Sequence, residues 1–251
     1  MLALHAYPET WNEERAETAF GQRIEEMHDV AKRSGRKLWL NEMGYADYRY
    51  QPSHASLWGT NTYYRYEHSR RYQADFLFKS FVMTLASGDV SLAGWYRIDD
   101  FSDADPRMPQ DKVNDHLGIM DVEGKPKPAF FAFRFFNSLF ADPVRVIEEP
   151  AAKPGSQAVV RVFQEKDGEV IVAGWLRSSK YAEVGIHSGM LQDQRRERIN
   201  VVLPCSATRV RTFNVEGKKL STSRRRSRVL PGIELRGDQV YLAQVTCATP
   251  Q

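Results

Sequence analysis

The 251-residue sequence has no long hydrophobic run. A transmembrane helix needs about 18 to 20 consecutive apolar residues, and no stretch of the chain approaches that length. The N-terminus, MLALHAYPETW, has no basic segment and only a very short apolar run, so it does not have the form of a secretory signal. We therefore expect a soluble protein with no membrane partner.

Residues for metal or cofactor chemistry are also scarce. There are two cysteines, Cys205 and Cys247, which predict either a structural disulfide or two buried thiols. The six histidines lack the spacing to cysteines or carboxylates that a metal site requires. The sequence has neither a glycine-rich phosphate loop nor the G-x-S-x-G motif of a serine nucleophile. We expect no metal and no cofactor.

The charge balance argues against a nucleic-acid-binding protein. The chain has 35 basic and 32 acidic residues, a net charge of +3, whereas such proteins concentrate basic charge in patches. One segment departs from this balance, KKLSTSRRRSR at residues 218–228. Its composition predicts a solvated loop or an edge strand, and a contact with a polyanion is the less common alternative.

Up to about residue 143, strand-like and helical patterns alternate. Strands are predicted at residues 2–7, 37–42 and 90–98, and helices at about 13–34, 67–86 and 125–140, with Gly35 ending the first helix. Strands joined by crossover helices imply a parallel sheet. Loops after the carboxyl ends of such strands are typical of a (β/α)8 TIM barrel. Only three of its eight units are present, so the predicted fold class is α/β, with a partial barrel in residues 1–143.

Residues 144–251 have a different pattern. Short β-branched segments alternate with turn signals at intervals of about ten residues, and Asp167-Gly168 predicts a hairpin turn. Separate strands are expected at residues 198–204 and 207–220 among others. This pattern predicts an antiparallel β-sandwich as a second, accessory domain.

Glu42 is the first candidate for a functional residue. The segment LWLNEMG ends an apolar strand on Asn41 and Glu42, just before Gly44. In a barrel this position lies at the rim that carries the active site. A carboxylate there can serve as a nucleophile, a general acid or base, or a metal ligand. A helix N-cap or an ion-paired rim carboxylate is the structural alternative.

Further candidates lie at the ends of the other two strands. His5 and Tyr7 are two residues apart, so they share a face and can either hydrogen-bond a neighbouring carboxylate, setting its charge state, or pack in the core. Trp95 can stack on a sugar ring or fill the core. Asp99 and Asp100 are adjacent and point in opposite directions, which suits contacts to substrate hydroxyls better than a catalytic pair.

Together these motifs resemble the last three β/α units of clan A glycoside hydrolases, such as families 5 and 39. The similar segments are LHAYP, LWLNEMGY, VSLAGWYRIDD and DHLGIMDVEGKPKPAFFAF, within residues 1–140. The resemblance implies that Glu42 is the nucleophile of a retaining glycosidase, that His5 and Tyr7 accompany it, and that a tryptophan lines the sugar subsite. The residues expected to contact substrate or shape its cleft are His5, Tyr7, Asn41, Trp58, Tyr63, Tyr64, Trp95 and Asp99.

One part of the clan pattern is missing, the acid/base glutamate of an Asn-Glu motif on the fourth strand. The sequence therefore resembles the C-terminal part of a larger enzyme that hydrolyses O-glycosidic bonds of poly- or oligosaccharides. Its partner would be a carbohydrate, and the parent enzyme is expected to be secreted or periplasmic. The alternative is a non-catalytic carbohydrate-binding protein that uses the aromatic cleft or the β-sandwich. No oligomeric state is predicted.

Overall fold

A computed structural model describes residues 1–7, 16–47, 69–88, 90–102, 115–147, 155–177, 195–237 and 239–248. Trp58, Tyr63 and Tyr64 lie outside these ranges. The chain divides into two compact units: the first contains Met1–Phe133, and the second contains Arg134–Arg177 and the strands that follow. Within the described residues, no helix combines the length and the apolar character needed to cross a membrane.

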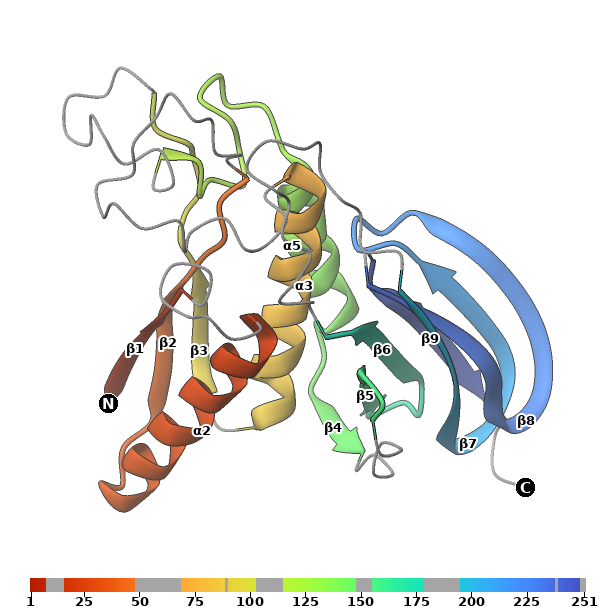
Figure 1. The fold of residues 1–251 in the computed structure, drawn as a ribbon. Coiled ribbons are helices and arrows are strands. Elements are labelled where there is room, and N and C mark those ends of the chain that lie inside the picture. Colours follow the sequence, from red (N-terminus) through yellow and green to blue (C-terminus); the bar gives the residue numbers. More distant parts are fainter. Residues whose placement is uncertain are drawn as a thin grey trace. The chain divides into compact units, whose positions relative to one another are not determined.

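The first unit contains a three-stranded parallel sheet. Its strands lie in the order β1 (Leu2–Ala6), β2 (Leu38–Met43) and β3 (Val90–Trp95), connected through helices α2 (Ala16–Arg33) and α3 (Arg70–Ser87) (Figure 1). Crossovers between neighbouring parallel strands share one hand, which places α2 and α3 against each other on the same face. The predicted alternation of strands and helices is confirmed. The described strands form an open sheet and close no barrel.

Local sequence sets the ends of both helices. The Ser69 hydroxyl caps α3 by accepting a hydrogen bond from the backbone N–H of Tyr72. Gly88 ends α3 at a φ of 71°, and Gly35 follows α2 at a φ of 61°, as its position in the sequence predicted. Val30, in the last part of α2, is 38% exposed.

The two faces of the parallel sheet differ in cover. Leu4 and Leu40 are paired in register and buried on the helix side. The neighbouring row runs through Ala3, Trp39 and Leu92 and points the other way. In that row Ala3 is exposed and Leu92 is 44% exposed. Parallel sheets are normally covered on both faces. In the described part of the chain, helices cover one face, and the face that carries Ala3 and Leu92 is left partly exposed.

The second unit contains one antiparallel sheet of six strands. Helix α5 (Pro128–Leu139) begins in the first unit and ends in the second. The strands are β4 (Val144–Ile147), β5 (Ala158–Glu165), β6 (Val170–Leu176), β7 (Arg196–Phe213), β8 (Lys219–Arg236) and β9 (Tyr241–Cys247), in the order β4-β5-β6-β9-β7-β8. The predicted turn at Asp167-Gly168 joins β5 to β6, with Gly168 at a φ of 92°.

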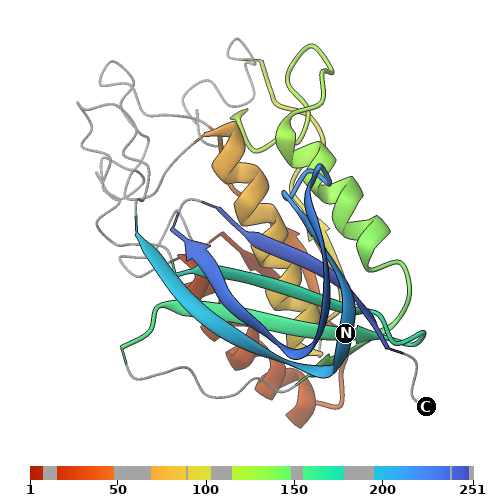
Figure 2. The same cartoon turned by 90° about the vertical axis from the view of Figure 1, so that its right-hand side faces the viewer.

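The expected sandwich of two sheets was wrong in one respect, because the described strands form a single, strongly bent sheet (Figure 2). Residues 198–213, expected as parts of two separate strands, belong to the continuous strand β7. Only the part of β7 from Ala207 onward pairs with β9, whereas both halves pair with β8. The register is irregular between Val202 and Ala207, so the proline at position 204 bends β7 without ending it.

The bend folds the first half of β7 and the second half of β8 over β5 and β6. Glu197 of β7 accepts a hydrogen bond from Ser156, just before β5. A Cβ on Gly174 of β6 would lie 3.0 Å from the Leu235 side chain of β8. A single sheet thus encloses an apolar core from two sides. Cys205 and Cys247 form a disulfide at the bend, with their Cα atoms 5.8 Å apart.

Candidate functional site

Glu42 lies at the carboxyl end of β2, the middle strand of the parallel sheet. The Tyr7 hydroxyl donates a hydrogen bond to Glu42 Oε2 over 2.9 Å. His5 Nδ1 lies 3.2 Å from the same oxygen. The Glu42 side chain is 33% exposed, so it is supported from one side and accessible from another. The His-x-Tyr spacing thus delivers both side chains to one carboxylate oxygen.

A bulge in β2 brings a third residue into this group. Leu4 pairs with Leu40 and His5 pairs with Glu42, which leaves Asn41 as an extra residue. In a regular strand Asn41 and Glu42 would point to opposite faces. Here the Asn41 amide Nδ2 reaches His5 Nε2 at 3.2 Å. An amide that donates to Nε2 leaves the proton on Nδ1, which can then donate to the carboxylate.

Two glycines make room for this arrangement. A Cβ on Gly44 would lie 2.6 Å from the carbonyl oxygen of Tyr96 and 2.9 Å from the Tyr7 ring. A Cβ on Gly94 would lie 2.9 Å from the carbonyl oxygen of Asn41, at the bulge. The Tyr7 and Tyr96 rings meet edge to face, with centroids 6.3 Å apart. Close backbone approach at these glycines therefore fixes both the Tyr7 ring and the bulge.

Trp95 lies in a separate aromatic cluster. It packs against buried Tyr45, Tyr72 and Phe76, and its indole N–H donates to the carbonyl oxygen of Leu117 over 3.3 Å. These contacts give Trp95 the structural role that its sequence position also allowed. None of the contacts described for its ring involves Glu42, so its place in a sugar subsite stays a prediction. Trp58 lies outside the described residues.

Asp99 and Asp100 have different environments. Asp99 is exposed, and its backbone carbonyl accepts a hydrogen bond from the Arg97 guanidinium. The Asp100 carboxylate is buried and accepts hydrogen bonds from the Gly118 N–H at 2.9 Å and the Lys127 ammonium at 2.8 Å. Of the two, only Asp99 presents its side chain to solvent, and its contact with substrate also stays a prediction.

Asp47, Asp100 and His116 together have the composition of a metal site, with ligand atoms within 4.8 Å of one another. The Lys127 ammonium lies 2.6 Å from Asp100 Oδ2 and 3.1 Å from Asp47 Oδ1. His116 Nδ1 is 3.8 Å from both carboxylates. Lys127 itself is 0% exposed. The Lys127 ammonium therefore supplies the positive charge between these two carboxylates.

Gln73 and Lys127 were not singled out from the sequence. The Gln73 side-chain amide donates to the carbonyl oxygens of Tyr45 at 2.9 Å and Gly118 at 3.1 Å, which ties together the segments that follow β2 and β3. One signal was available, because α3 carries apolar residues on every side and is therefore a buried helix. A polar residue on a buried helix needs a partner.

Comparisons with known proteins give a likeness of structure only. No protein-family model matches the sequence, and no curated protein does. A family 39 glycoside hydrolase from Bacteroides cellulosilyticus WH2 matches with a TM-score of 0.61 at 14% identity, covering 97% of this chain and 44% of the other. A family 51 arabinofuranosidase from Xanthomonas axonopodis pv. citri gives 0.54 at 12%, with 98% and 52% covered. A family 44 xyloglucanase from Paenibacillus polymyxa gives 0.50 at 12%, with 97% and 46% covered.

At these low identities, the likeness shows the fold alone. The resemblance to clan A glycoside hydrolases that the sequence predicted is confirmed at that level. The chain spans about half of the length of the enzymes that it matches. Nearly all of this chain is covered in each case, so both units take part in the likeness.

Proposed function

We propose that this chain is the C-terminal part of a retaining glycoside hydrolase that acts on O-glycosidic bonds of poly- or oligosaccharides, with Glu42 as the nucleophile. The observation that carries the proposal is the convergence of Tyr7 and His5 on Glu42 Oε2, at 2.9 and 3.2 Å. It occurs at the carboxyl end of a parallel strand, where barrel enzymes place their active sites. The shared fold with glycoside hydrolases supports it.

The geometry suits a nucleophile. A carboxylate that attacks an anomeric carbon must be held in one direction by groups that are themselves fixed. Tyr7 and His5 hold Oε2, and Asn41 orients His5. Among the described residues, Oε1 of Glu42 has no hydrogen-bond partner, which leaves this oxygen for bond formation with the sugar. Attack forms the glycosyl–Glu42 ester and breaks the bond to the leaving oxygen, and water later cleaves the ester.

Retention also requires a second carboxyl group about 5 to 5.5 Å away as the acid and base. In the family pattern this group belongs to an earlier strand than the three matched here. We therefore propose that residues 1–143 are the last three units of a (β/α)8 barrel and that residues 144–251 are an accessory β-domain. The exposed row of Ala3 and Leu92 supports this proposal, because this face would form the interior of a closed barrel. A polysaccharide substrate implies a secreted or periplasmic parent enzyme.

The first test uses dinitrophenyl glycosides of several sugars. Their phenolate leaves without protonation, so glycosylation of Glu42 does not need the missing acid. We expect release of dinitrophenol by this chain and a loss of roughly a thousandfold or more in Glu42→Gln. Glu25→Gln, which changes an exposed glutamate on α2, is the matched control and keeps full activity. Equal rates in the two variants would end the assignment of the nucleophile.

A second measurement separates the enzyme from the binding protein. A non-catalytic carbohydrate-binding protein keeps its affinity for oligosaccharides in Glu42→Ala and releases no dinitrophenol. A trapped glycosyl ester, made with a 2-fluoro glycoside and located on Glu42 by mass spectrometry, excludes that alternative. The extent of labelling also tests whether this chain alone holds a sugar correctly.

A further inference from the structure

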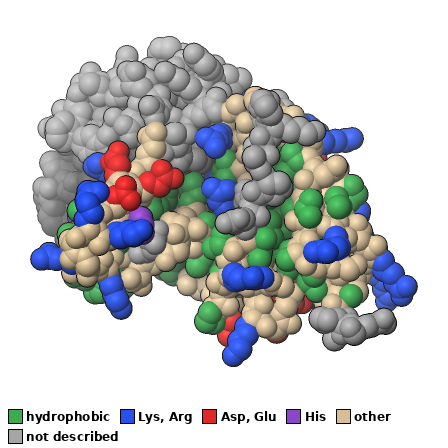
Figure 3. Space-filling model, turned by 90° about the horizontal axis from the view of Figure 1, so that it is seen from below, with side chains coloured by type: hydrophobic (Ala, Val, Ile, Leu, Met, Phe, Trp, Pro, Cys, Tyr) green, Lys and Arg blue, Asp and Glu red, His purple; other side chains and the backbone are tan. Residues whose placement is uncertain are grey.

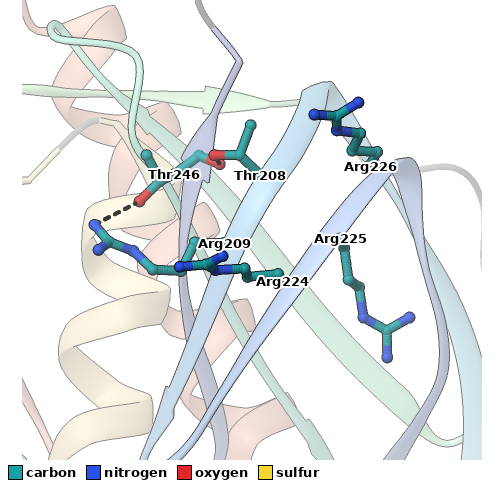
Figure 4. Close-up of a pocket in the computed structure, with 6 residues that line it drawn as sticks. All are labelled: Thr208, Arg209, Arg224, Arg225, Arg226 and Thr246. Atoms are coloured by element: carbon teal, nitrogen blue, oxygen red, sulfur yellow. Dashed lines mark hydrogen bonds between the residues drawn. The ribbon is translucent and has the colours of Figure 1, made fainter.

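We propose that a basic surface in the second unit binds an anionic polysaccharide, one that carries carboxylate or sulfate groups. The surface is a hollow of about 510 Å³ on strands β7, β8 and β9 (Figure 4). Its lining residues are Thr208, Arg209, Arg224, Arg225, Arg226 and Thr246. Three of these arginines come from the basic segment at residues 218–228, which the structure places on the edge strand β8.

The pairing of β7 with β8 sets two positive charges against each other. Arg209 and Arg224 are direct partners in the antiparallel register, and both are exposed. Like charges in this position destabilise a sheet. Arg209 donates a hydrogen bond to Thr246, whose hydroxyl donates to Glu169, a carboxylate already paired with Arg211. Within the described residues, no carboxylate forms an ion pair with Arg224.

A second like-charged pair in the same hairpin is neutralised by a carboxylate of the protein. Arg196 is the register partner of Arg236, and Glu234 lies 3.2 Å from the first and 3.1 Å from the second. The hydrogen bond from Arg236, helped by the charges of Arg196 and Arg198, lowers the pKa of Glu234 below its usual value. The sheet thus supplies its own anion at this end. At Arg209 and Arg224 we infer that the anion comes from a ligand.

The arrangement of the arginines suits a polymer better than a small ion. Arg224 extends across the hairpin toward Arg209, while Arg225 and Arg226 project from β8 in other directions (Figure 4). Two residues of strand span about 7 Å, so the guanidinium groups are spread along the strand. Each can bind an oxyanion through two parallel N–H bonds. On the face drawn in Figure 3, by contrast, Lys and Arg side chains are dispersed among other types.

The choice of a glycan as the anion rests on the proposed function. Two further features of the lining agree with it. The Thr208 hydroxyl donates to the Thr246 carbonyl oxygen and can still accept a hydrogen bond from a sugar hydroxyl. Among the described residues that line the hollow, none is an aromatic side chain on which the bases of single-stranded nucleic acid could stack. The site also lies in a different unit from Glu42, so its binding can be tested without hydrolysis.

The test measures binding of the full chain to heparin, which is sulfated, to polygalacturonate, which carries only carboxylates, to neutral dextran and to duplex DNA. One variant combines Arg224→Gln, Arg225→Gln and Arg226→Gln. Its matched control combines Lys32→Gln, Arg33→Gln and Arg36→Gln, which are exposed in the first unit. Each variant removes three positive charges and takes the net charge from +3 to 0.

We expect binding to one or both anionic glycans, weakened about tenfold in the β8 variant and unchanged in the control. The glycan that binds identifies the anion. Three results overturn the proposal: no binding to either glycan at low salt, an equal loss in the control, or tighter binding to DNA. Glu42→Gln is expected to bind the glycan as tightly as the wild type does. Binding at the β8 surface can therefore be established even if the proposed hydrolysis fails. Arg224→Gln alone, which relieves the like-charge pair, is expected to raise the Tm and serves if the triple variant unfolds.

Discussion

Replacing Lys127 by methionine tests the buried ion network most directly. Methionine keeps an unbranched stem of similar length, so the change removes mainly the charge. Lys127 is 0% exposed, and its ammonium lies 2.8 and 2.6 Å from the two oxygens of Asp100 and 3.1 Å from Asp47 Oδ1. The side chains of these carboxylates are only 4% and 6% exposed. Lys127→Met leaves the Asp100 carboxylate without its ammonium partner, whereas Asp47 keeps the Arg70 guanidinium 3.3 Å from its Oδ2.

The expected cost follows from this geometry. Breaking a buried ion pair by removing one partner costs about 3 to 5 kcal/mol. Because Asp100 loses its ammonium while Asp47 keeps its pairing with Arg70, we expect a loss near the middle of this range. His116 cannot replace it directly, since Nδ1 is 3.8 Å from each carboxylate. A loss of about 4 kcal/mol increases the unfolded fraction about a thousandfold. This loss is a large part of the free energy of unfolding of an ordinary domain.

Urea titrations followed by fluorescence and circular dichroism measure the free energy of unfolding. The matched control is Lys125→Met, two residues away, because the Lys125 side chain is 72% exposed and its pairing with Glu123 is superficial; it costs less than about 1 kcal/mol. Adding Asp100→Asn to Lys127→Met removes the carboxylate charge that has lost its cation, so the double change costs less than the sum of the single changes. If Lys127→Met is no more destabilising than Lys125→Met, the network is not what stabilises this region.

Two further predictions concern stability in each unit. Burial, followed by the charges of nearby carboxylates, raises the pKa of Glu165 above its ordinary 4.5, so its ionised form is disfavoured in the folded state. Glu165→Gln therefore raises the Tm at pH 7. This increase in Tm shrinks as the pH falls through the raised pKa of Glu165 and is absent below pH 4.5. An increase in Tm that persists in acid contradicts the assignment to Glu165 ionisation. Gly44→Ala costs about 1 to 3 kcal/mol, because its Cβ would meet the Tyr96 carbonyl at 2.6 Å. Gly21→Ala, in the open on α2, gains about 0.5 to 1 kcal/mol; equal unfolding energies for the two variants refute the steric argument.

Features that depend on neighbours in the chain followed from the sequence. The strands and helices of the first unit, the cap at Gly35 and the hairpin turn at Gly168 lie where hydrophobic period and turn chemistry placed them. The same is true of His5 and Tyr7, because residues two apart on a strand share a face. Parallel crossovers then bring β1 beside β2, which is how these two side chains reach Glu42.

Features that depend on distant residues required the tertiary structure. A strict alternation would have separated Asn41 from Glu42, and only the bulge, accommodated by Gly94 on β3, lets both reach His5. Lys127 could not be connected with Asp47, 80 positions earlier, from any local pattern.

The second unit shows the same division. The sequence displayed the arginines of β8, but the register of the hairpin decided that Arg224 faces Arg209. The two strands expected on either side of Pro204 form one continuous strand, β7, with an irregular register around the proline. The propensity for helix, strand or turn depends on short stretches of sequence. Bulges, strand register and buried ion pairs depend on the packing of segments that are distant in the sequence and meet only in the folded chain.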